Sequence, residues 1–240
     1  MPTARFFCPS PLQADSRIEL PESLAHHAIR VLRLPAGTAV TLFDGRGGQY
    51  PAVLDIQGRT ALANVGPHEA IECELRGRLT LIQGIASGDK MDWIVEKAVE
   101  LGVSELIPVA AERSVLRLTG PRLEKRLAHW RAIVQAASEQ CGRNRLMQVR
   151  EPAPLRDSLD HLSGISLFCH PEGDIDFPQA LAGVGECLNL LVGPEGGWSP
   201  DELTLARSRG LQGVRFGPRV LRTETAGLAM VAAAGALLRW

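Results

Sequence analysis

Three loops rich in glycine and proline carry the residues best suited to binding chemistry, and each follows an apolar run typical of a β-strand. They are residues 168–173 (FCHPEG), 193–197 (GPEGG) and 216–228 (FGPRVLRTETAGL). Glycine lets backbone amides approach a ligand without an intervening side chain. Parallel strands end at one edge of their sheet, where open α/β sheets bind ligands. We therefore expect the three loops to converge on one pocket, although any one of them alone is also consistent with an ordinary turn.

Basic residues suggest that the ligand or partner carries negative charge. Arg219 and Arg222 bracket two apolar residues in the third loop, and arginines at the end of a strand can bind an anion. The alternative is an ordinary connection with solvated arginines. Residues 113–150 hold nine basic residues against two acidic ones, which suits phosphates, although a solvated helix face has the same composition.

Several other chemistries lack their motifs. No G-x-G-x-x-G follows a strand, and neither a P-loop nor a G-x-S-x-G elbow occurs. Residues 87–90 (SGDK) match S-x-x-K, but the partner motifs S-D-N and K-T-G are missing, so we interpret the match as chance at a helix N-cap. His26 and His27 have no third ligand at metal spacing, and we expect no metal site.

Composition indicates a globular protein with one large domain or two modest ones, since 45% of its 240 residues are hydrophobic. The net charge of −1 excludes a strongly basic surface over the whole chain, so nucleic acid would have to bind a local patch. Five cysteines without a C-x-x-C pair favour reduced thiols and a cytoplasmic location. The longest apolar run, residues 226–238, has 13 residues and predicts a packed core helix, not a membrane span.

The first part of the chain has the pattern of a small β-barrel. Short strands are predicted at residues 39–43, 49–56 and 60–65, with residues 44–48 (DGRGG) as a hairpin connection. Residues 22–34 have helical spacing instead. We expect a first domain over residues 1–73.

From residue 78 onward, strands and helices alternate, which predicts a parallel α/β sheet in a second domain, residues 74–240. Ser199, Pro200 and Glu202 have the spacing of a capping box, and Thr223 or Thr225 is expected to cap the last helix. The expected strands are 79–85, 106–109, 165–169, 188–192 and 214–216, and the expected helices include 89–101 and 121–141.

Two long motifs, LVGPEGGWSPDE (191–202) and GPRVLRTETA (217–226), resemble those of the 16S ribosomal RNA uridine-N3 methyltransferase family of the SPOUT class. The resemblance extends over most of the chain and includes GDKMDWIVEKAVELGV (88–103) and HAIRVLRL (27–34). It implies an N-terminal PUA-like RNA-binding β-barrel and a C-terminal methyltransferase domain with a parallel sheet and a trefoil knot. It also implies S-adenosyl-L-methionine as cofactor, the 16S rRNA of the small ribosomal subunit as substrate, and a homodimer.

The resemblance also implies roles for individual residues. Deprotonating the uridine N3 needs a base, for which Glu195 and Glu224 are the candidates. The charge that then spreads onto the carbonyl oxygens needs a stabilising donor, and Arg222, Arg219 and Arg113 are the candidates. The residues implied in cofactor binding are Leu167, Phe168, His170, Leu191, Val192, Gly193, Pro194, Gly196, Gly197, Phe216, Gly217, Val220, Leu221, Thr223 and Ala226. Those implied in RNA binding are Arg5, Arg30, Arg33, Arg113, Arg143 and Arg145.

The chain departs from the family pattern at three places, and two other functions stay open. Ser87 precedes Gly88 at a position where the family often has a basic residue. Met147 stands where the family commonly has proline, and Trp198 stands where the family has various apolar residues. One alternative is a non-catalytic module that binds ribosomal RNA during assembly, although a scaffold would need no small-molecule pocket. The other is a SPOUT enzyme that methylates another RNA, such as a transfer RNA or a ribose hydroxyl, although EKAVELGV together with GPEGG favours uridine N3.

Overall fold

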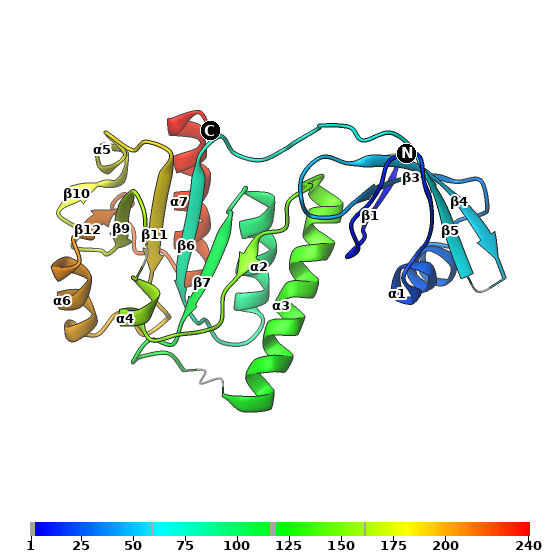
Figure 1. Cartoon of the computed structure of the whole chain (residues 1–240). Coiled ribbons are helices and arrows are strands. Elements are labelled where there is room, and N and C mark those ends of the chain that lie inside the picture. Colours follow the sequence, from blue (N-terminus) through cyan, green and yellow to red (C-terminus); the bar gives the residue numbers. More distant parts are fainter. Residues whose placement is uncertain (1–2, 59, 116–118, 161) are drawn as a thin grey trace. The chain divides into compact units, whose positions relative to one another are not determined.

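The computed structural model describes residues 3–58, 60–115, 119–160 and 162–240, which fold into two compact units (Figure 1). The described residues up to Glu74, together with Ser138–Leu146, form the first unit. Those of Leu75–Ala137 and Met147–Trp240 form the second. Each unit buries a hydrophobic cluster of its own.

The first unit contains a five-stranded sheet. In spatial order its strands are β1 (Ala4–Phe7), β3 (Ala39–Phe43), β4 (Tyr50–Gln57), β5 (Thr60–Val65) and β2 (Arg17–Glu19). β1 pairs with β3 in parallel, and the other pairs are antiparallel. The three central strands lie where the sequence predicts them. β1 and β2 lie outside the predicted strands, because three or four residues carry too little alternation to be recognised.

Residues with helical spacing follow β2 and form α1 (Glu22–His26), which continues into a π-helical turn, η1 (His27–Val31). Leu24 and Ala28 pack into the hydrophobic cluster of this unit, as the helical spacing predicts. Val31 and Leu32, expected on the same face, are instead 60% and 44% exposed, because the π-helical turn changes the spacing of the side chains. Arg33 has a φ of 53°, and this left-handed conformation ends the helical stretch.

The segment Ser138–Leu146, at the end of α3 (Gly120–Cys141), belongs to the first unit through polar contacts. The fully buried Asn144 donates from Nδ2 to the carbonyl oxygen of Ile71 at 2.7 Å and accepts from Arg5 Nη2 at 2.6 Å. Arg143 donates from Nε and Nη2 to the two carboxylate oxygens of Glu74, at 3.0 and 2.6 Å. These partners lie far apart in the sequence, so no local pattern indicates that the segment belongs to this unit.

The second unit contains a seven-stranded sheet in which every pair is parallel, as the alternation of elements predicts. β6, β7 and β11 are almost wholly buried, which is typical of a parallel sheet covered on both faces. Two strands of two residues each, β8 and β10, lie outside the predicted ones. In spatial order the strands are β10 (Ile175–Asp176), β12 (Gln212–Arg215), β9 (Ile165–Cys169), β11 (Cys187–Val192), β6 (Arg78–Gly84), β7 (Glu105–Val109) and β8 (Gln148–Val149).

The helices of the second unit start and stop for local reasons. α2 (Lys90–Glu100) ends before Gly102, whose φ of 87° suits the position after a helix, as predicted. The predicted capping box of α6 (Pro200–Ser208) is confirmed, since Ser199 Oγ accepts from the N–H of Glu202 and Glu202 Oε2 accepts from the N–H of Ser199. The remaining helices are α4 (Leu155–Ser158), α5 (Phe177–Ala180) and α7 (Thr223–Leu238).

α7 packs closely on β6 and β11 because Gly227 faces these strands. A Cβ atom on Gly227 would lie 3.1 Å from Leu81 Cδ1 and 3.3 Å from Gln83 Oε1. A Cβ atom on Gly235, in the same helix, would have only Leu75 Cδ2 within 4 Å, at 3.9 Å. Within the described chain, no helix is long and apolar enough to cross a membrane, α7 included.

We expect the two glycines of α7 to respond to alanine with opposite signs. Gly227→Ala should lower the free energy of unfolding by roughly 1–2 kcal/mol, because its methyl group overpacks the helix against β6. Gly235→Ala should raise it by up to about 1 kcal/mol, because alanine has the higher helix propensity and the space is open. Urea unfolding of both variants measures this; equal effects would contradict the close packing.

Candidate functional site

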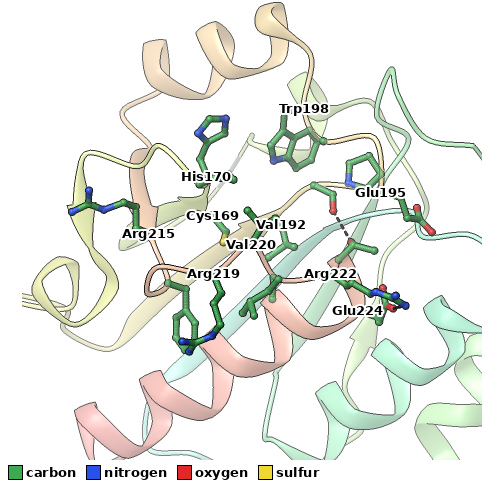
Figure 2. Close-up of a pocket in the computed structure, with 18 of the residues that line it drawn as sticks. Cys169, His170, Val192, Glu195, Trp198, Arg215, Arg219, Val220, Arg222 and Glu224 are labelled. Carbon is green, nitrogen blue, oxygen red and sulfur yellow. Dashed lines mark hydrogen bonds and ion pairs between the residues drawn. The ribbon is translucent and has the colours of Figure 1, made fainter.

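One cavity of about 670 Å³ lies at the carboxyl ends of β9, β11 and β12 (Figure 2). Its lining comes from the ends of these strands and the loops after them, at residues 169–171, 192–195, 197–198 and 215–224, with Lys90, Arg113 and Ala226. The three strands are parallel neighbours in the sheet, so their ends share one edge. The predicted convergence of the three loops is therefore confirmed.

The hydroxyl of Thr223 joins the parts that surround this cavity. Thr223 Oγ1 donates to the carbonyl oxygen of Gly193 at 2.6 Å and accepts from Gln83 Nε2 at 2.9 Å. Gln83 is fully buried in β6, and its Nε2 also donates to the carbonyl oxygen of Gly84 at 3.0 Å. The expected capping role of the threonines is wrong, because Arg222 occupies the N-cap of α7 and no side chain caps the helix. Thr223 instead holds the start of α7 against β6 and against residues 193–197, the glycine loop.

Close backbone packing also holds residues 193–197 against the end of β6. A Cβ atom on Gly84, the last residue of β6, would lie 2.5 Å from both N and Cδ of Pro194. Any side chain at residue 84 would therefore push the glycine loop away from the end of the sheet. On the cavity side, Gly197 and Gly217 have φ angles of 69° and 73°, and a Cβ on either would meet nothing within 4 Å. Their backbone is thus open to a ligand.

One part of the cavity wall is mainly apolar. Cys169, Val192, Val220 and Leu221 contribute to it, and burial raises the pKa of the Cys169 thiol. Figure 2 shows Cys169 and Val192 side by side, with His170 and Trp198 beyond them. His170 Nδ1 accepts from the N–H of Glu172 at 3.2 Å, which orients the imidazole ring.

The rim of the cavity carries charged groups that contact one another. Glu195 Oε1 accepts from the N–H of Ser87 at 3.0 Å, from Ser87 Oγ at 2.7 Å and from Lys90 Nζ at 3.1 Å. Burial by itself raises the pKa of Glu195, but these hydrogen bonds from Ser87 and Lys90 outweigh it and lower the pKa to about 2. Glu195 is therefore a carboxylate at neutral pH that fixes the glycine loop to the start of α2.

Glu224 and Arg222 complete the rim. Glu224 is only 18% exposed in its side chain, and its Oε2 lies 3.8 Å from Lys90 Nζ. That oxygen is buried and accepts no hydrogen bond from any group in the described part of the chain. The Arg222 side chain is 84% exposed, with Nη1 4.0 Å from Glu224 Oε1. The arginine thus stays free to reach a ligand at the mouth of the cavity.

The cavity brings together most of the residues that the sequence implicates. All four catalytic candidates, Arg222, Glu195, Arg219 and Glu224, line it. The cofactor candidates that line it are His170, Val192, Gly193, Pro194, Gly197, Phe216, Gly217, Val220, Leu221, Thr223 and Ala226. Leu167, Phe168 and Leu191 lie outside its lining as core residues, each at most 1% exposed. Gly196 also lies outside the lining and packs on Arg113, whose Cβ and carbonyl oxygen would be 3.0 Å from an added Cβ.

Lining residues outside the predicted set include Lys90, Pro171, Trp198, Arg215 and Pro218. Lys90 belongs to the S-x-x-K match that the sequence treats as chance. Its contact with Glu195 joins residues 105 apart in the sequence, so local spacing does not identify Lys90 as a site residue. A ligand-side role for Trp198 also lacks a sequence signal, because an apolar residue beside a glycine loop is usually core.

The six arginines expected to bind RNA have different environments. Arg30, Arg33, Arg113 and Arg145 are exposed, and Arg145 Nε lies 3.3 Å from Glu72 Oε1. Arg143 is only 3% exposed and engaged by Glu74, so its guanidinium is a structural group of the first unit. Arg5 is similarly held by Asn144 and by Gln49 Oε1 at 2.7 Å, and burial lowers its pKa. The expectation that Arg5 and Arg143 contact RNA phosphates conflicts with these internal partners.

Comparisons with known proteins match both units. The RNA methyltransferase domain family matches residues 73–235, and the RNA methyltransferase PUA domain family matches residues 20–65. Ribosomal RNA small subunit methyltransferase E of Mycobacterium tuberculosis is 33% identical over 225 residues, covering 89% of this chain and 84% of the relative. The crystal structure of the Neisseria gonorrhoeae protein of that name, bound to S-adenosyl methionine, is 37% identical, with a TM-score of 0.91 over 98% of each chain.

We expect Thr223→Val to lower the free energy of unfolding by roughly 1–3 kcal/mol, because it removes the partner of the Gly193 carbonyl and an acceptor of the buried Gln83 amide. The matched control is Thr225→Val, an exposed position in the same helical turn, where the change should stay within about 0.5 kcal/mol. Denaturant unfolding of both variants gives the comparison. Similar losses in the two would show that the hydroxyl of Thr223 is not the cause.

We also expect the Glu195 carboxyl carbon to titrate near pH 2 in ¹³C NMR, instead of near its ordinary value of 4.5. Because the folded-state pKa is lowered, the stabilisation is present above pH 4.5 and is lost as the pH falls toward 2. Ser87→Ala should move the titration upward, since it removes a hydrogen bond to the charged form. Ser208→Ala, outside the cavity lining, should leave it unchanged; an unshifted titration in Ser87→Ala would refute the assignment.

Proposed function

This chain belongs to the RNA methyltransferase family that includes ribosomal RNA small subunit methyltransferase E, and from that premise we propose that it methylates N3 of a specific uridine in 16S rRNA. The observation that carries the proposal is the cavity at the ends of β9, β11 and β12. There an open glycine backbone and an apolar wall adjoin a charged rim with one buried carboxylate oxygen that has no hydrogen-bond partner in the described chain. These features suit a small-molecule donor beside a weakly acidic nitrogen.

We propose that the cavity binds S-adenosyl-L-methionine. Its volume of about 670 Å³ lies inside the range of roughly 300–1,000 Å³ that small-molecule sites occupy. Val192, Val220 and Leu221 supply apolar contacts, and Gly197 and Gly217 leave the backbone accessible. When bound, the cofactor supplies a methyl group on a sulfonium, which is the electrophile for an in-line displacement. The chain's own task is to hold the acceptor nitrogen in line and to keep water away.

Of the two carboxylates, Glu224 is the better general base. A pKa of about 2 makes Glu195 a weak proton acceptor, since a base works best with a pKa near the working pH. We therefore withdraw Glu195 as a base and assign it to positioning Lys90 and the glycine loop. Glu224 Oε2 is buried, with its hydrogen-bonding capacity free within the described chain, so it is suited to take the proton from uridine N3.

The negative charge left on the uridine carbonyl oxygens calls for a cation at the mouth of the cavity. Arg222 fits this role because its side chain is 84% exposed and only at the limit of ion pairing with Glu224. Lys90 Nζ is within 4 Å of both Glu195 and Glu224 and helps to compensate the carboxylates. Arg219 and Arg113 also line the cavity and are the remaining candidates for contact with the substrate.

We propose that the first unit, which contains the PUA match, helps to hold the ribosomal RNA. Arg30 in η1 and Arg33 just after it are exposed, and Arg145 is exposed near the end of the segment Ser138–Leu146. Exposed arginines such as Arg30 and Arg33 can pair with phosphates. Arg145 would have to share its guanidinium with Glu72, 3.3 Å from its Nε. Arg5 and Arg143 would have to give up buried partners, so we leave them out of the RNA surface.

A trefoil knot, a homodimer and a cytoplasmic location complete the proposal. β12 lies on the opposite side of β9 from β11, yet the chain after β12 returns to place α7 on β11 and β6. This return across the strand ends is consistent with a knot. Trp93 on α2 and Leu237 on α7 are 53% and 55% exposed, and they offer apolar surface to a second copy. Sedimentation at micromolar concentration should give a dimer.

Incubating the purified protein with S-adenosylmethionine and either 16S rRNA or small ribosomal subunits tests the function. Mass spectrometry of the digested RNA should show 3-methyluridine at one position. A 2′-O-methylated nucleoside, or methylation of transfer RNA instead, would favour the other RNA methyltransferase classes. RNA binding without any methylation and without cofactor binding would favour the scaffold.

We expect Arg222→Ala to lower turnover by roughly 100-fold while cofactor affinity hardly changes, as for the loss of one charge-stabilising donor. Arg222→Lys should recover little, because an ammonium cannot reproduce the planar guanidinium. Arg209→Ala, which removes an arginine outside the cavity, is the control and should keep full turnover. Loss of cofactor binding together with a lower melting temperature would mean that Arg222 only stiffens the loop.

A further inference from the structure

Trp198 carries a polar atom that the function proposed above leaves unused. Its side chain lines the cavity, and the residue is only 6% exposed. The indole Nε1 is buried and has no hydrogen-bond partner in the part of the chain that the structure describes. A buried donor without an acceptor costs free energy, so native proteins normally give such a group a partner.

Gly193 leaves this N–H open. A Cβ atom on Gly193 would lie 3.2 Å from Nε1 and 3.3 Å from Cδ1 of Trp198, so any side chain there would cover the N–H edge of the indole. Gly193 lines the same cavity. Figure 2 shows the nitrogen of Trp198 on the side of its ring that faces His170 and Val192. The donor is therefore directed toward space that a ligand would fill.

We propose that the indole N–H of Trp198 donates a hydrogen bond to the nucleoside part of the bound cofactor; this rests on the proposed S-adenosylmethionine site. The acceptor is an uncharged oxygen or nitrogen, because a carboxylate in such a buried place would need a cation beside it. The cations of the rim lie in a wetter setting, with the side chains of Lys90 and Arg222 36% and 84% exposed. The amino-acid part of the cofactor is better placed there.

Indole resonances in ¹⁵N–¹H spectra of the full chain give a direct test. Each of the four tryptophans contributes one indole N–H peak, and single replacements of Trp93, Trp130 and Trp240 by Phe assign the remaining one to Trp198. The two probes are S-adenosylhomocysteine and 5′-methylthioadenosine, which shares the nucleoside but lacks the amino-acid part. Both should move the Trp198 proton downfield and slow its exchange with water.

Calorimetry on Trp198→Phe measures the contribution of the donor. Removing it should weaken both probes by roughly 10-fold, the size expected when a ligand acceptor is left unpaired. Trp93→Phe, an exposed position outside the lining, is the matched control and should bind both probes as the parent does. The melting temperature of each ligand-free variant shows whether packing alone has changed.

The outcomes separate this proposal from the function on which it rests. If both probes bind but the Trp198 peak stays in place, or Trp198→Phe binds them equally well, the hydrogen bond is refuted while the cofactor site stands. If only S-adenosylhomocysteine moves the peak, the acceptor is not in the nucleoside and the proposal fails. If neither S-adenosylmethionine nor the probes bind the parent protein, the proposed function itself fails.

Discussion

The candidate site depends on one buried hydroxyl. Thr223 Oγ1 links Gln83 of β6 to the carbonyl of Gly193, so a single side chain fixes the start of α7 and the glycine loop relative to the sheet. Gly84 permits this arrangement, since a side chain there would push the loop away from β6, and Gly227 lets α7 pack closely on Leu81 and Gln83 of that strand. The hydrogen bond from Gln83 is buried, where an unpaired amide has no water to replace its partner, and the one to Gly193 is partly buried. Loops without secondary structure of their own thereby form a defined cavity.

Differences in exposure divide the cavity into two chemical environments. The wall that includes Trp198 and Val192 is buried, and polar groups there need partners from a ligand. The rim is more exposed to solvent, and its charged groups contact one another. Glu195 and Glu224 differ there in the hydrogen bonds that they accept. Ser87 and Lys90 stabilise the ionised form of Glu195, whereas one oxygen of Glu224 keeps its hydrogen-bonding capacity within the described structure. Environment, not residue type, therefore sets the low pKa of Glu195.

The first unit shows how a short segment can be recruited by polar contacts. Asn144 and Arg143 are buried, and they bind the backbone of Ile71 and the carboxylate of Glu74. Leaving either partner unpaired would cost free energy of folding, so the side chains of Asn144 and Arg143 stabilise the fold. Arg30 and Arg33 of the same unit are exposed instead, so burial does not tie their side chains to the fold.

The sequence by itself determined the parallel sheet, the three central strands of the first unit, the capping box of α6 and the convergence of three loops. All of these follow from periodicity, turn residues or order along the chain, which are local properties. The tertiary structure alone decided that Thr223 is a junction and not a cap, that Lys90 joins the rim, that Arg5 and Arg143 are internal, and that Ser138–Leu146 belongs to the first unit. Each of these depends on a partner distant in the sequence, and the pKa of Glu195 and the open N–H of Trp198 depend on such partners too. Pair interactions across long separations leave no period in a single sequence, so they become visible only once the chain has folded.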